Sequence, residues 1–333
     1  MSTAAVSIMN KSELQRGPGP DFSLAGRGSA IDRMFQGATM FFALLVLALL
    51  GGVIVSLIVG SLPILRTAGL SFLYTEVWNP VTDEYGALAP IYGTLVTSAI
   101  AMVIGVPLSF GIAIFITELC PARLKRPIGT AIELLAGIPS IIYGIWGLFV
   151  LAPILQQTVQ PFLIATLGNL PGIGRLFAGP PYGIGVFTAG VILAVMVLPF
   201  ISSVMRDVFE TVPPILKESA YGLGATTWEV VFKVVLPYCR VGVVGGVMLG
   251  LGRALGETMA VTFVIGNAHR ISASLLAPGT TISATIANEF AEAVGEYYTS
   301  ALITLGLLLF AITLVVLTIA RLMLARLAMA EGK

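Results

Sequence analysis

Long stretches without any charged residue constrain this chain more than any other feature. Five of them contain no Asp, Glu, Lys or Arg, and a sixth, residues 241–269, contains only Arg253 and Glu257. The five uncharged stretches are residues 34–65, 85–117, 134–174, 176–205 and 297–320. Because a helix needs about 20 apolar residues to cross a bilayer, each stretch is long enough to span a membrane.

Proline-containing loop signals trim these stretches to six predicted membrane helices. The predicted spans are residues 38–62, 91–116, 128–152, 183–205, 240–264 and 299–323. Their apolar runs are continuous and do not alternate with polar residues, which favours helices over the strands of a β-barrel. We therefore expect an all-α integral membrane domain over residues 36–330, preceded by a flexible tail, residues 1–35. Between the third and fourth spans, residues 159–167 are too short to cross and are expected to lie at the interface or to re-enter the membrane.

Composition excludes soluble and nucleic-acid-binding proteins. Charged residues make up 11% of the chain and hydrophobic residues 57%, whereas a soluble domain carries roughly 25% charged residues. The net charge of +1 provides no basic surface for nucleic acid. The lipid bilayer is the expected surrounding of this chain.

The basic residues predict the orientation of the chain in the membrane, because cytoplasmic loops carry more Lys and Arg. One side of the predicted topology holds 14 of the 18 basic residues, and it includes both termini. We expect the N- and C-termini to be cytoplasmic, without a cleaved signal peptide. Cys120 and Cys239 lie at cytoplasmic ends of spans and are interpreted as packing residues. His269, the only histidine, has no neighbouring ligand residues and is interpreted as incidental.

The loop between the fourth and fifth spans, residues 206–238, is the one cytoplasmic loop long enough to have its own structure. Pro213-Pro214 suits the start of a short helix, and Gly222 and Gly224 interrupt it. Thr226 or Thr227 can cap a second helix, which is expected to end at Pro237. Composition alone leaves open a loop that merely connects two spans.

The order of residues in this loop resembles a signature of ABC importer permeases, E-A-A, three residues, G, nine residues, I-x-L-P. Glu218-Ser219-Ala220 is followed by Gly224, six residues after the glutamate, and then, after nine intervening residues, by Val234-Val235-Leu236-Pro237. The resemblance implies a cytoplasmic helix-turn-helix that docks on an ATPase subunit. The residues to which it assigns this coupling are Glu218, Ser219, Ala220, Gly224, Leu236 and Pro237.

Three further segments resemble the phosphate-specific ABC importer permeases of the PstC type. They are residues 84–88 (EYGAL), 135–144 (LAGIPSIIYG) and 252–261 (GRALGETMAV). The resemblance implies a six-helix type I permease of the bacterial inner membrane that transports phosphate. Its implied partners are a second permease subunit, ATP-binding subunits at the cytoplasmic face and a phosphate-binding protein outside.

The chain itself lacks the residues that an ATPase needs. No G-x-x-x-x-G-K-S/T phosphate-binding loop occurs in the sequence. We therefore expect a transport subunit that is not an enzyme, that needs no cofactor, and that is driven by ATP hydrolysis on separate subunits.

Arg253 and Glu257 are the charged residues that the fifth span would bury in the membrane. An ionised side chain at a helix centre costs about 2.5–3.5 kcal/mol on the insertion scale, so a use for the pair is expected. Their i,i+4 spacing would place both on one helix face, close to a stripe formed by Gly242, Gly246, Gly250 and Ala254. The pair is either a structural salt bridge or, as the resemblance implies, part of the path along which phosphate moves.

Glu133 is expected to be hydrated or to pair with Arg126 or Lys125, and Pro139 is expected to break the third helix. A permease for sulfate or molybdate would also explain the charge pair. A secondary anion carrier would explain the pair but not the loop signature.

Overall fold

The computed structural model describes residues 25–330, with side chains over residues 31–326. It divides into two compact units, residues 1–56 and 57–333, of which the first is described from Ala25. The described part of the first unit is one helix, the beginning of α1. The predicted tail, residues 1–35, falls mostly outside the described residues, and its described part, from Ala25, already belongs to α1.

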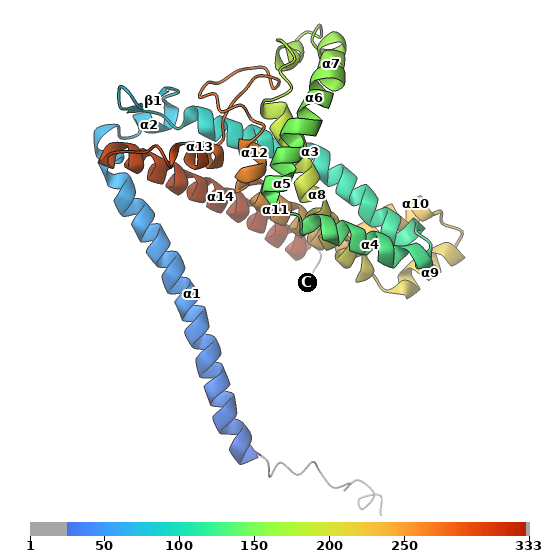
Figure 1. Ribbon diagram of the computed structural model, residues 1–333. Helices are drawn as coiled ribbons and strands as arrows, with labels where there is room; N and C mark the ends of the chain where they lie inside the picture. Colours follow the sequence, from blue (N-terminus) through green and yellow to red (C-terminus); the bar gives the residue numbers. More distant parts are fainter. Residues whose placement is uncertain (1–24, 331–333) are drawn as a thin grey trace, which may run out of the picture. The chain divides into compact units, whose positions relative to one another are not determined.

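Helices dominate the described chain (Figure 1). The helices are α1 (Ala25–Thr67), α2 (Ser71–Tyr74), α3 (Leu88–Ile114), α4 (Ala122–Ala136), α5 (Ser140–Trp146), α6 (Ala152–Ile154), α7 (Gln160–Leu167), α8 (Val186–Glu210), α9 (Pro214–Gly222), α10 (Thr227–Val230), α11 (Leu236–Leu255), α12 (Met259–Thr262), α13 (Ile282–Glu289) and α14 (Glu296–Ala330). The strands β1 (Trp78–Asn79) and β2 (Glu84–Tyr85) form a small antiparallel hairpin in which Trp78 pairs with Tyr85.

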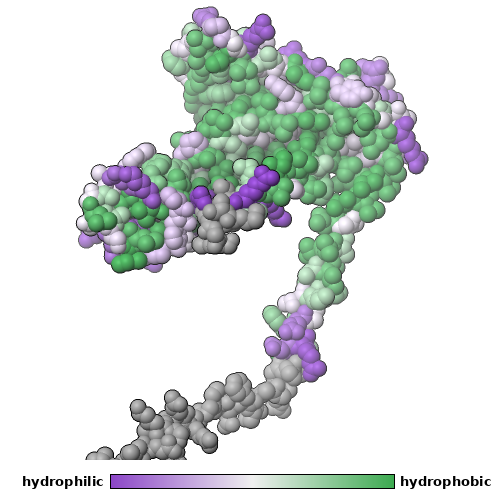
Figure 2. Space-filling model, turned by 180° about the vertical axis from the view of Figure 1, so that it is seen from behind, coloured by the Kyte–Doolittle hydropathy of each residue, from purple (hydrophilic) through white to green (hydrophobic). Residues whose placement is uncertain are grey.

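Among the described residues, six helical segments are long and apolar enough to cross a membrane, which confirms the predicted fold class. They are Ile31–Thr67, Leu88–Leu119, Ser140–Leu167, Val186–Glu210, Thr227–Leu255 and Glu296–Arg326. Apolar residues cover most of the visible face of the second unit, as Figure 2 shows. Such a surface suits lipid or another membrane subunit and does not suit water.

The third and fifth predicted spans have the wrong bounds. The third does not cover residues 128–152, because the chain breaks at Gly137-Ile138-Pro139 and the long helical segment begins at Ser140. Residues 159–167, expected at the interface, continue that segment as α7. Pro139 has the extended backbone that ends one helix and starts the next.

The fifth long segment begins before Pro237 and ends well before residue 264. Pro237 does not end a helix, because a π-helical turn, Val231–Val235, leads directly into α11 and Pro237 occupies the first turn. Because Pro237 has no N–H to donate to the preceding turn, the continuous helical segment is expected to bend near it. Cys239 has non-helical backbone angles and marks a kink. Gly256 then ends α11.

The main core of the second unit forms where α3 packs along α8 and where α11 and α12 cover them. Small residues allow this close approach: an added Cβ at Gly190 would lie 2.5 Å from Ile100, and one at Gly105 would lie 3.4 Å from Val197. A second cluster lies at the other end of α3, where Phe72, Tyr85 and Ile282 pack against α14. This arrangement places the interruption between α11 and α12, which begins at Gly256, inside the bundle.

Candidate functional site

The break between α11 and α12 positions the two charged residues that the sequence singles out. Arg253 lies in the last turn of α11 and is exposed, whereas Glu257 follows the helix end and is half-buried. On either side of the break, Ala254, Leu255, Ala260 and Val261 are buried. The break therefore lies within packed protein, which is where irregular backbone is tolerated in a membrane protein.

Arg253 and Glu257 do not share one helix face, so this part of the prediction is wrong. Gly256 ends α11 before Glu257 is reached. The Oε1 atom of Glu257 instead accepts a hydrogen bond of 3.3 Å from the backbone N–H of Ala260, in the first turn of α12. Within residues 31–326 no ion pair joins the two side chains. The guanidinium of Arg253 is thus exposed at the surface of this chain, where another molecule can contact it.

The glycine stripe of α11 packs against α8, as its spacing predicts. An added Cβ would lie 2.6 Å from Val208 at Gly242, 3.0 Å from Val204 at Gly246 and 2.5 Å from Ile201 at Gly250. Because α8 occupies this side of α11, the exposed Arg253 points to a different side of the helix. An arginine within a membrane bundle faces protein or water and avoids lipid. The exposed side of Arg253 is therefore suited to an aqueous path or to another subunit.

The loop between α8 and α11 begins with the short helix α9, as the sequence predicts, whereas the second predicted helix, α10, continues through the π-helical turn into α11. Gly224 has a φ of +89°, a left-handed conformation that a glycine adopts without the cost of a Cβ. This turn brings the N–H of Ala225 to the carbonyl oxygen of Ala220, at 3.1 Å. Thr226 and Glu229 then form a reciprocal capping box at the start of α10. The turn and the cap fix the angle between α9 and α10.

The residues of the loop signature occupy different environments. Glu218 is exposed, and Ser219 is exposed with its hydroxyl donating to the carbonyl of Ile215. Ala220 is half-buried against the main core, while Leu236 and Pro237 lie at the start of α11. The signature therefore combines one exposed face with the packing that holds the loop to the bundle.

Large apolar side chains surround the exposed face of this loop. Ile215, Leu223 and Trp228 are 65%, 90% and 69% exposed. A cluster of exposed apolar side chains rimmed by charged ones is typical of a surface that binds another protein. The loop thus presents a contact surface.

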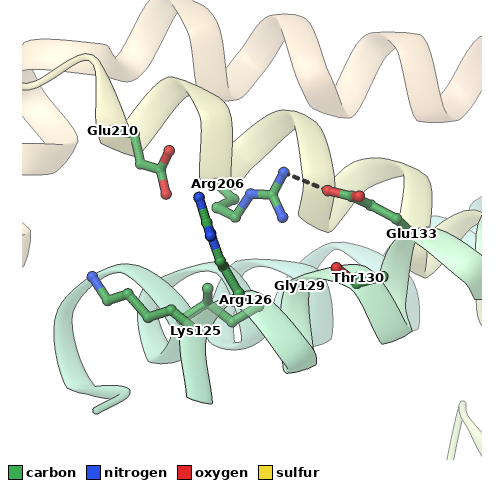
Figure 3. A pocket seen from close by; sticks show the side chains of 8 residues that line it. Lys125, Arg126, Gly129, Thr130, Glu133, Arg206 and Glu210 are labelled. Carbon is green, nitrogen blue, oxygen red and sulfur yellow. Dashed lines mark hydrogen bonds and ion pairs between the residues drawn. The ribbon is translucent and has the colours of Figure 1, made fainter. Parts of the chain in front are cut away.

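A polar pocket of about 220 Å³ lies next to this loop, between α4 and α8 (Figure 3). The residues that line it are Ile116, Lys125, Arg126, Gly129, Thr130, Glu133, Arg206 and Glu210. Arg206 donates from Nη2 to Glu133 at 2.7 Å. Glu133 therefore pairs with Arg206 and not with Arg126 or Lys125, while its side chain is 50% exposed, which agrees with the hydrated alternative. Gly129 leaves room for this contact, because an added Cβ would lie 2.8 Å from Nη1 of Arg206.

The orientation of α4 explains why hydropathy misplaced the third span. Its polar face, with Arg126 and Glu133, is turned toward α8 (Figure 3). The opposite face presents Leu124, Leu134 and Leu135, which are 50%, 70% and 44% exposed. A helix with apolar residues outside and ionised residues inside suits a membrane boundary, where lipid or another subunit covers the apolar face.

An aromatic cluster that the sequence did not reveal lies at the end of the bundle away from α9. The indole of Trp78 in β1 stacks on His269, and the rings of Tyr85 and Tyr298 stack on each other. His269 Nε2 lies 3.6 Å from Oε1 of Glu289, and Oε2 of the same carboxylate accepts a hydrogen bond from the Tyr298 hydroxyl. Burial, with Asp83 close by, raises the pKa of Tyr85 to about 12. The cluster ties the hairpin to α13, α14 and the loop that follows α12.

The six membrane-length helical segments among the described residues define the chain as a multi-pass helical membrane protein. The sequence matches the family described as "Binding-protein-dependent transport system inner membrane component" over residues 105–329. The chain belongs to this family.

Curated relatives are similar over most of their length. The "Phosphate transport system permease protein PstC" of Mesorhizobium japonicum is 68% identical over 284 residues, which cover 85% of this chain and 87% of the relative. The protein of the same name from Pasteurella multocida is 61% identical over 84% of this chain and 87% of its own length. The resemblance to PstC-type permeases is thereby confirmed.

A solved structure supports the fold alone. The crystal structure of a bacterial alginate ABC transporter in complex with an alginate pentasaccharide-bound periplasmic protein contains a chain with a TM-score of 0.55 and 18% identity. The match covers 92% of this chain and 98% of that chain. The helical arrangement is therefore that of an ABC importer permease.

Proposed function

We propose that this chain is a membrane-spanning subunit of an ATP-driven phosphate importer in the bacterial inner membrane. The observation that carries the proposal is the 68% identity to a phosphate transport system permease over 85% of the chain. The internal helix break with its exposed arginine supports it, because discontinuous helices commonly form the substrate sites of transporters.

Phosphate passes beside Arg253 in this proposal. A guanidinium presents a planar set of N–H donors that matches a phosphate oxyanion and remains charged at any physiological pH. Glu257, four residues further on, balances the charge near the path when no anion is present. The second permease subunit contributes the other wall of the path, facing the exposed side of Arg253.

The loop between α8 and α11, which contains α9 and α10 and is called here the α9–α10 loop, is the site at which separate ATP-binding subunits drive transport. Its exposed Ile215, Leu223 and Trp228 provide the apolar contact surface, and Glu218 provides a charge for the rim. ATP-driven closure of the ATP-binding subunits displaces α9 and α10. The bundle then opens toward the outside and accepts phosphate from a binding protein, and ATP hydrolysis resets it.

The membrane orientation follows from this assignment. The α9 end of the second unit faces the cytoplasm, together with both termini of the chain. The loops at the opposite end, around β1, β2 and His269, face the phosphate-binding protein.

Uptake of labelled phosphate tests the proposal. The chain is reconstituted in vesicles with its second permease, ATP-binding subunits and binding protein, and sulfate and molybdate are added in excess as competitors. We expect uptake that requires ATP and persists in the presence of both competitors. Competition by sulfate or molybdate would assign a different oxyanion, and uptake without the ATP-binding subunits would indicate a secondary carrier.

A further inference from the structure

One ion pair ties the α9–α10 loop to the end of the second membrane helix. Lys217 in α9 lies with its Nζ 2.6 Å from Oε1 of Glu118. Glu118 belongs to the last turn of the long segment Leu88–Leu119. The two residues are 99 positions apart in the sequence, so the contact is made only by the folded chain.

This ion pair is largely buried, unlike its neighbour in the same loop. The side chains of Glu118 and Lys217 are 7% and 18% exposed. Glu229 and Lys233, which pair at 2.9 Å within the loop, are 39% and 73% exposed. Exposed pairs contribute little because water and salt screen them. A buried pair resists separation, since each charge would be left without solvent or partner.

The turn that carries Glu118 is held from a second side. Lys125 of α4 donates from Nζ to the backbone carbonyl of Thr117, at 2.6 Å. Two lysines, one from α4 and one from α9, therefore contact the consecutive residues Thr117 and Glu118 at the end of the second membrane helix. The contact between Arg206 and Glu133 continues the connection from α4 to α8.

The turn that contains Thr117 and Glu118 differs in its hydrogen bonding from the α-helix that precedes it. Residues Phe115–Leu119 form a π-helical turn, in which the N–H of Cys120 donates to the carbonyl of Phe115. Such turns accommodate an extra residue within a helix and are frequent at functional sites. A local change of this turn would move Glu118 without unwinding α3.

We propose that Lys217 and Glu118 are positioning residues that transmit the displacement of α9 to the second membrane helix. Lys125 and the Arg206–Glu133 pair extend the movement to α4 and α8. The inference rests on the proposed function, because it requires that α9 is moved by the ATP-binding subunits. It assigns transmission to the half-buried Lys217, while the adjacent Glu218 lies at the exposed docking face.

The test compares the number of anions imported per ATP hydrolysed by the reconstituted complex. The single variants are Glu118→Gln and Lys217→Gln, and the double variant exchanges the charges, Glu118→Lys with Lys217→Glu. We expect each single variant to import at least about five-fold less per ATP, within the usual range of coupling between sites. We expect the exchanged pair to recover most of the loss.

Two further variants separate transmission from folding. Glu118→Leu with Lys217→Met removes both charges and leaves no buried charge unpaired, so the complex should assemble while its import per ATP stays low. Lys233→Met removes the exposed pair of the same loop and should leave the ratio at the wild-type value. Should the wild-type complex import an anion other than phosphate, the ratio is measured with that anion, so an error in the substrate does not affect this test.

The inference is overturned by either of two results. Single variants that assemble and import as much per ATP as the wild type would show that the ion pair carries no movement. A charge-exchanged variant as uncoupled as the single variants, with normal assembly, would show that the ion pair is not the link.

Discussion

The indole of Trp78 and the imidazole of His269 lie stacked, with ring centroids 5.3 Å apart and an angle of 11° between the ring planes. The side chain of Glu289 lies on another side of the imidazole, 3.6 Å away. His269, in the loop that follows α12, thus contacts both the hairpin and α13. This end of the bundle is held together by side chains that no motif in the sequence connects.

The first prediction concerns the pH dependence of stability. Burial lowers the pKa of His269 below its ordinary value of 6.5, and Glu289 opposes this shift. Because the unfolded chain takes up the proton more readily, the stability contributed by neutral His269 is present above pH 6.5 and is lost as the pH falls below it. We expect the thermal midpoint of the complex in detergent to fall from pH 7.5 to pH 5.5.

The matched variant for this prediction is His269→Phe, which retains a ring that can stack on Trp78 and has no titrating group. We expect its midpoint to change less over the same pH range. An equal change in the variant and the wild type would show that His269 is not the group responsible.

The second prediction uses two glycines of α3. At Gly93 an added Cβ would lie 1.8 Å from the backbone oxygen of Thr280, whereas at Gly111 nothing lies within 4 Å. An alanine in a helix interior normally stabilises by about 0.5–1 kcal/mol relative to glycine. We expect Gly111→Ala to be neutral or stabilising and Gly93→Ala to destabilise by about 1–3 kcal/mol, the usual cost of overpacking.

Thermal unfolding of the two variants, measured by light scattering in detergent, checks this contrast. Equal midpoints for Gly93→Ala and Gly111→Ala would mean that the loop containing Thr280 does not pack on α3.

The third prediction concerns Glu218, which is exposed on α9. A charge reversal on a docking surface opposes a partner group that was attracted before. We expect Glu218→Lys to weaken association with the ATP-binding subunits and to lower phosphate uptake, while Glu218→Gln has a smaller effect. Co-purification of the ATP-binding subunits with each variant provides the measurement. Full association and uptake with Glu218→Lys would exclude a role for this side chain in docking.

The pattern of charges allowed the six-helix architecture to be predicted because lipid excludes ionised side chains. The bounds of the third span could not be predicted in this way, since the polar face of α4 is turned toward α8 and its leucines face outward. Hydropathy also missed the end of α11 at Gly256, because the residues after the break are as apolar as those before it.

The candidate site shows the same limit. The glycine spacing in α11 predicted a close helix contact, and α8 provides it. The partners of Glu133 and Lys217 could not be predicted, because Arg206 and Glu118 are 73 and 99 positions away in the sequence. Local sequence patterns contain no information on contacts at such separations.

The final prediction tests whether Arg253 lies on the phosphate path. Loss of a hydrogen bond to a charged group costs about 1.5–3 kcal/mol, which corresponds to about a 10- to 100-fold loss of rate. The measurement is ATP-driven uptake of labelled phosphate by the reconstituted complex with Arg253→Ala, with ATP hydrolysis recorded in parallel. Arg321→Ala, at an exposed arginine of α14, is the control. We expect uptake to fall by that factor with Arg253→Ala, while ATP hydrolysis continues and the control transports normally. Uptake at the wild-type rate by an intact Arg253→Ala complex would contradict the account.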